Sequence, residues 1–125
     1  MRSMFIDAQS FNQNLSAWDV SAVTEMGNMF RGTTAFNQDL STWDVSAVAT
    51  MQAMFANAQS FDQDLSVWDV STVTDMNTMF YNAQSFNQDL SAWNTGKVTN
   101  MGESERRDLG TLRFAFAGVL TSYCR

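Results

Sequence analysis

Carboxylates are the side chains of this sequence that could do chemistry, because they recur at a fixed spacing of 25 residues. One set of equivalent positions holds Asp19, Asp44, Asp69 and Asn94, and a second holds Asp39, Asp64 and Asp89. Two like charges about 5 Å apart in water repel each other by about 0.8 kcal/mol, so a stacked column of carboxylates favours a basic partner or a cation. The structural alternative is that these aspartates accept hydrogen bonds from turn backbone and from neighbouring Ser or Thr.

The sequence lacks the residue types that most other catalytic and metal-binding sites need. The chain has no histidine and a single cysteine, Cys124, so zinc sites, nucleophilic triads and disulfide frameworks are excluded. Calcium binding stays open as an alternative, but no glycine-containing calcium loop is present, and we predict neither a metal site nor a cofactor. An enzyme is not expected, because no carboxylate pair is singled out for glycoside hydrolysis.

The charge and the hydropathy pattern exclude further classes of partner. With 13 acidic and 7 basic residues the net charge is −6, which repels nucleic acid and anionic membrane surfaces. No apolar run approaches the roughly 20 residues that span a bilayer, and no signal peptide is recognisable in this chain. The 45% of hydrophobic residues in a 125-residue chain are enough for one domain with its own core.

A tandem repeat of 25 residues organises the chain as far as Met101. Aromatic and aliphatic positions align without gaps in four successive units: Phe11, Phe36, Phe61 and Phe86; Leu15, Leu40, Leu65 and Leu90; Trp18, Trp43, Trp68 and Trp93; Met26, Met51, Met76 and Met101. A period of this length indicates one short supersecondary unit per coil, with equivalent side chains stacked in columns.

The spacing within one unit predicts its elements. Leu40, Trp43, Val45 and Val48 alternate as in a short strand, whereas Met51, Met54, Phe55 and Ala58 fall at i, i+3, i+4 and i+7, as on one face of a helix. We therefore predict an α/β solenoid of about four coils, with short parallel strands on one side and short helices on the other.

Two units carry a family resemblance. FNQDLSTWDVSAVATMQAMF (36–55) and FDQDLSVWDVSTVTDMNTMF (61–80) closely resemble the repeats of BspA-like leucine-rich-repeat surface proteins. The resemblance covers residues 1–101, and it implies a leucine-rich-repeat-like solenoid used for adhesion or protein binding on a cell surface or outside the cell. It provides no catalytic residues.

Invariant and varied positions predict different roles. The invariant Gln and Ser positions, such as Gln38 and Ser41, are interpreted as structural hydrogen-bonding columns, and the Trp and Met columns as core. Helix-face positions vary between units in two columns: Arg31, Ala56 and Tyr81; Glu25, Thr50, Asp75 and Asn100. Such variation is what a specific binding surface needs, although an unconstrained surface shows it too.

Both ends depart from the repeat. Met1 aligns with Met26, so we expect an open amino-terminal end where Phe5, Phe11 and Leu15 contact a partner, a copy of the chain or a larger assembly. Residues 102–125 diverge from the repeat, and they are interpreted either as a capping helix or as the product of a frame or gene-model error. The cluster of Arg106, Arg107 and Arg113 favours a membrane or calmodulin-like partner only weakly, because acidic residues lie in the same segment.

These observations predict a non-catalytic module of cell-surface or adhesion type that binds protein or glycan. The alternative is a structural element whose coils stack end to end, or with a partner subunit, in a larger assembly.

Overall fold

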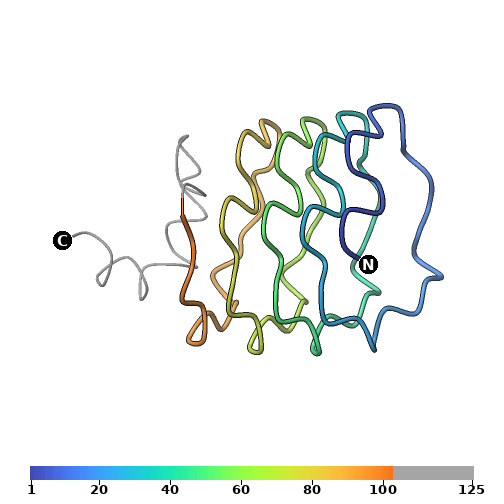
Figure 1. Ribbon diagram of the computed structural model, residues 1–125. Coiled ribbons are helices and arrows are strands. Elements are labelled where there is room, and N and C mark those ends of the chain that lie inside the picture. Colours follow the sequence, from blue (N-terminus) through green and yellow to red (C-terminus); the bar gives the residue numbers. More distant parts are fainter. Residues whose placement is uncertain (103–125) are drawn as a thin grey trace.

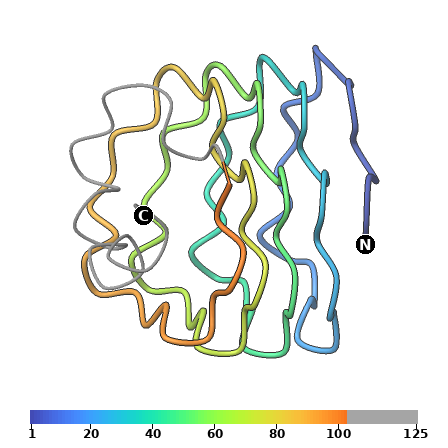
Figure 2. The same ribbon diagram turned by 60° about the vertical axis from the view of Figure 1, so that its left-hand side comes forward.

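The chain winds through successive coils of the same outline, which lie side by side in Figures 1 and 2. The structure is a computed structural model, and it describes residues 1–102. Three isolated parallel bridges join residues 25 positions apart: Glu25 to Thr50, Thr50 to Asp75 and Asp75 to Asn100. One coil is therefore one 25-residue repeat. The predicted capping helix falls almost wholly outside the described residues.

The predicted secondary structure is wrong. Residues 1–102 contain no helix and no sheet, because the only strand-like pairings are those single-residue bridges, and the rest of each coil consists of turns and irregular backbone. The chain is therefore not an α/β solenoid with strands on one side and helices on the other. The segment that we expected to be a strand, around Trp43 and Val45, is irregular backbone with a turn on either side.

Left-handed residues explain why the segment predicted as a helix is not one. Positive φ angles recur four residues apart within each coil, for example at Asn28 (57°) and Gly32 (72°), and at Ala53 (52°) and Asn57 (59°). A right-handed helix cannot contain a residue with positive φ in every turn. The chain instead makes one tight turn after another, and we name residues 1–8, 26–33, 51–58 and 76–83 the turn segments.

The backbone N–H groups of a turn segment alternate between two kinds of partner. The N–H groups of Met51, Ala53 and Phe55 donate to carbonyls of the next coil at 2.9, 2.8 and 2.9 Å. Those of Met54 and Ala56 close turns within the segment, by donating to the residue three positions earlier at 3.1 and 3.2 Å. Each coil is therefore bonded to the next through its main chain, independently of which side chains it carries.

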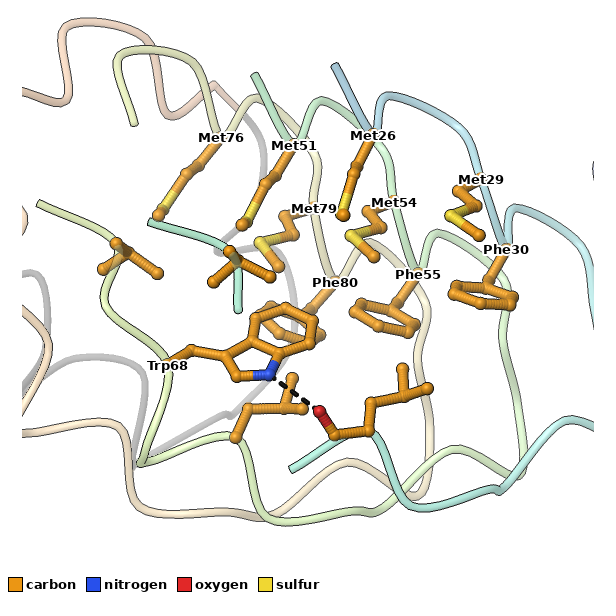
Figure 3. Close-up of a cluster of buried hydrophobic side chains, with 14 of the residues drawn as sticks. Met26, Met29, Phe30, Met51, Met54, Phe55, Trp68, Met76, Met79 and Phe80 are labelled. Atoms are coloured by element: carbon orange, nitrogen blue, oxygen red, sulfur yellow. Dashed lines mark hydrogen bonds between the residues drawn. The ribbon is translucent and has the colours of Figure 1, made fainter. Parts of the chain in front are cut away.

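The core consists of stacked columns of side chains. The rings of Phe30, Phe55 and Phe80 follow one another at centroid distances of 5.5 and 5.6 Å, and two methionine columns lie beside them (Figure 3). Met51, Met54, Phe55 and Ala58 are all fully buried, so the helix-like spacing identified the correct inward residues although the backbone is not helical.

Polar side chains inside and beside the core bond from coil to coil. The indole Nε1 of Trp68 donates to the carbonyl of Leu40 at 3.0 Å, and Trp43 and Trp93 make the equivalent bond (Figure 3). The Oδ1 atom of Asn37 accepts from the backbone N–H of Asp62 at 3.0 Å and from Nε2 of Gln63 at 2.9 Å. These bonds fix the distance between neighbouring coils and the register in which their residues align.

Candidate binding surface

The first carboxylate column caps turns within its own coils. Oδ1 of Asp44 accepts from the backbone N–H of Ser46 at 3.0 Å and from its Oγ at 2.6 Å. Asp19 makes the same two bonds with Ser21. The remaining members accept the equivalent backbone bond: Asp69 from Ser71 and Asn94 from Gly96. All four side chains are exposed.

The second carboxylate column is built in the same way. Asp39, Asp64 and Asp89 are exposed, and each accepts the backbone N–H of the serine two residues later at 2.8, 2.8 and 2.9 Å. Hydrogen bonds from turn backbone and serine are what we expected if these aspartates have a structural role. A basic partner on either column stays a prediction. Within residues 1–102, no three His, Cys, Asp or Glu side chains are grouped so that they could hold a metal ion.

The hydrogen bonds from serine lower the pKa of these carboxyls. For Asp44 the side-chain bond from Ser46 is the largest cause and the backbone bond is the second, and repulsion from Asp69 and Asp19 opposes them only weakly. The pKa of Asp39 is lowered chiefly by the backbone bond from Ser41. The serine bonds therefore outweigh the repulsion between stacked carboxylates, and the columns are ionised at neutral pH.

The residues expected at the open end lie at the outer side of the first coil. Phe5 and Phe11 are partly buried and stack on each other at 4.0 Å, whereas Leu15 is buried. Trp18 is 38% exposed, although Trp43 and Trp68 are only 3% exposed. The first coil therefore buries its aromatic side chains less completely than the coils that have neighbours on both sides.

A third surface is formed by the turn segments, and we name it the turn face. Ile6, Arg31, Ala56 and Tyr81 form one column on it, in which Ala56 is buried and the other three are exposed. Main-chain bonds hold this column in register, because Gly32 donates to the carbonyl of Ala56 at 2.8 Å and Asn57 donates to that of Tyr81 at 2.7 Å. Glu25, Thr50, Asp75 and Asn100 lie at the bridges that join the coils just before these segments.

A short chain of amides joins residues that neighbour Ala56 and Tyr81 in the sequence. Nδ2 of Asn82 donates to Oδ1 of Asn57 at 2.9 Å, and Nε2 of Gln84 donates to Oδ1 of Asn82 at 3.4 Å. Sequence reasoning did not single out these amides. Their signal was the column Asp7, Gly32, Asn57 and Asn82, whose residue types tolerate the left-handed conformation that all four adopt.

The turn face therefore combines side-chain types that differ from coil to coil with a backbone that does not. In the part of the chain that the structure describes, the guanidinium of Arg31 makes no ion pair and the hydroxyl of Tyr81 makes no hydrogen bond. Neither group therefore has a side-chain partner within residues 1–102. No helix in that part is long and apolar enough to cross a membrane.

The comparisons with known proteins identify a family but no activity. A family model described as a Mycoplasma protein of unknown function, DUF285, matches residues 1–106. No curated protein and no solved structure matches the chain. Since the match covers all of the described coils, this chain belongs to the DUF285 family.

Proposed function

We propose that the protein is a non-catalytic binding module that recognises protein or glycan through its turn face. The observation that carries this proposal is the contrast between inward and outward positions of the turn segments. Met54 and Phe55 repeat in every coil and are fully buried, whereas one outward column carries a different residue in each coil: Ile6, Arg31, Ala56 and Tyr81. Because the coils are joined by main-chain bonds, exchanging an outward side chain leaves the fold unchanged.

The state of the carboxylates favours binding over catalysis. A general acid needs a carboxyl whose pKa is raised by burial or by a close like charge. Among residues 1–102, every aspartate with a shifted pKa is shifted downward, with serine hydrogen bonds as the first cause. The resemblance to BspA-like surface proteins adds support for adhesion on a cell surface or outside the cell.

Parallel binding screens test this proposal. The chain would be applied to arrays of immobilised glycans and of extracellular proteins, beside a variant in which Arg31→Ala and Tyr81→Ala remove the long side chains of the turn face. Val67→Ala is the matched control, because Val67 is a 65% exposed hydrophobic residue outside the turn segments. We expect binding that the double variant loses and the control keeps. Absence of any binding by the unmodified chain would refute the proposal.

End-to-end stacking is the second candidate, and the exposed Trp18 favours it. Its indole has no carbonyl partner among the described residues, although the equivalent indoles each bond to a leucine of the preceding coil. Light scattering decides: a mass that does not change with concentration rejects stacking.

A further inference from the structure

We propose that Arg31, Ala56 and Tyr81 form a subsite for a neutral pyranose ring of a glycan, with the neighbouring amides as hydroxyl-binding groups. This inference rests on the proposed function and names the ligand class and the residues. It concerns one column of the turn face and none of the carboxylate columns.

The main chain fixes the spacing of the subsite. The backbone N–H of Asp7 donates to the carbonyl of Arg31 at 2.7 Å, that of Gly32 to the carbonyl of Ala56 at 2.8 Å, and that of Asn57 to the carbonyl of Tyr81 at 2.7 Å. Arg31, Ala56 and Tyr81 therefore lie at equivalent positions of three successive coils, which we call rungs. At about 4.8 Å for each rung, the backbone of Arg31 lies about 10 Å from that of Tyr81. The small side chain of Ala56 stands between them, and it is only 4% exposed. A ring lying on Tyr81 would extend over Ala56 toward the guanidinium.

The side chains supply the two kinds of contact that a sugar needs. The ring of Tyr81 is 42% exposed and offers a flat apolar surface to the C–H groups of a pyranose. Hydroxyl groups need both donors and acceptors, and amides provide both. Asn57 uses its Oδ1 as an acceptor for Asn82, and its Nδ2 donates no hydrogen bond to another described residue, so we assign this donor to the ligand. Arg31 adds a fork of donors that no described acid occupies.

Charge favours a neutral glycan over an acidic one. Residues 1–102 carry three basic and ten acidic side chains, and Glu25 and Asp75 lie at the bridges next to the turn face. An acidic sugar would meet this negative field, which the two cations of the turn segments, Arg2 and Arg31, do not cancel.

The composition of the patch favours a sugar over a protein. A protein interface is centred on a cluster of buried apolar anchors. Tyr81 is the only large hydrophobic side chain exposed in the last described turn segment, and the amide residues Asn82 and Gln84 follow it in the chain. One exposed ring with amides near it in the chain matches a ligand that has one apolar face and many hydroxyls.

Titration of single-site variants tests the subsite. The unmodified chain is first screened against an array that holds neutral oligosaccharides, acidic oligosaccharides and unglycosylated polypeptides. The neutral oligosaccharide that binds most strongly is then titrated by calorimetry. We expect Tyr81→Ala to weaken its affinity by about tenfold or more, and Tyr81→Phe to keep it within about threefold because the ring remains. Arg31→Ala should weaken the affinity, and Val67→Ala should leave it unchanged.

Thermal melts of each variant confirm that the fold is intact, as the exposure of both side chains leads us to expect. If neutral glycans bind and Tyr81→Ala has no effect, the subsite is wrong while the proposed function survives. Binding of polypeptides or acidic glycans alone refutes the neutral-sugar assignment in the same way. If nothing on the array binds, the subsite and the proposed function fail together.

Discussion

Removing the indole of Trp68 tests the column-packed core most directly. Trp68 is 3% exposed, its Nε1 donates to the carbonyl of Leu40 at 3.0 Å, and its ring lies 6.4 Å from that of Phe55 (Figure 3). An aromatic side chain buries about 150–250 Å², which corresponds to about 4–6 kcal/mol at about 25 cal/mol/Å². The compactness of the unfolded chain lowers that figure, and measured Trp→Ala changes in cores cost about 3–5 kcal/mol.

We therefore expect Trp68→Ala to lower the free energy of unfolding by about 4 kcal/mol, a large part of the total for a domain of this size. Urea denaturation followed by circular dichroism measures this loss, and calorimetry checks it without using tryptophan fluorescence. Coils above and below are bonded through the main chain, so they cannot close the gap that the indole leaves.

Trp18→Ala is the matched control within the same molecule. Trp18 occupies the equivalent position, but it is 38% exposed and its indole makes no hydrogen bond to a described residue. Its removal should cost about 1–2 kcal/mol, because much of the ring already contacts water. Equal losses for Trp18→Ala and Trp68→Ala would show that the column and the coil-to-coil bond add nothing, and would refute the reasoning.

Three further predictions concern an amide between two coils, a left-handed alanine and the exposed carboxyls. Asn37→Ala should cost about 1–2 kcal/mol in urea denaturation, because it orphans the N–H of Asp62, whereas Asn37→Asp should be tolerated since an aspartate already acts as this acceptor in the next coil. Ala53→Gly should stabilise the fold by about 0.5–1 kcal/mol by relieving a left-handed alanine, whereas Ala58→Gly should destabilise it; stabilisation by both would reject the strain argument. Lowering the pH through the ordinary aspartate pKa of 3.8 and below should lower the melting temperature, because the unfolded chain takes up protons first; a rising melting temperature would mean that relief of repulsion dominates. The carboxyls concerned are Asp19, Asp39, Asp44, Asp64, Asp69 and Asp89.

The repeat in the sequence predicted which side chains are buried but not the backbone that buries them. Met51, Met54, Phe55 and Ala58 are inward as expected. A helix and a series of tight turns place the same residues inward when both return to the core every three or four positions, so hydrophobic spacing alone cannot separate them. The left-handed Asn57 and its equivalents separate them, and the helix prediction did not weigh that column of Asp, Gly and Asn.

The candidate site was predictable in part. Variation at Arg31, Ala56 and Tyr81 was visible in the sequence, and so was the invariance around them. The amide chain through Asn57 and Asn82 was not, because it depends on two left-handed residues that bring amides from adjacent coils within 2.9 Å. The carboxylate columns were the most conspicuous feature of the sequence, yet their serine bonds give them a role inside each turn.

Main-chain bonding explains how one fold can carry both an invariant core and a variable surface. Alternate N–H groups of each turn segment donate to carbonyls of the next coil, whatever side chain each residue bears. The inward positions cannot change freely, since each ring must stack on rings about 5.5–6.0 Å above and below it. The outward side chains need not stack on their equivalents in neighbouring coils. Arg31, Ala56 and Tyr81 can therefore differ in size and charge while the distance between the coils stays the same. A ligand that spans several rungs can therefore be matched by changing single residues, without any change in the coils that hold them.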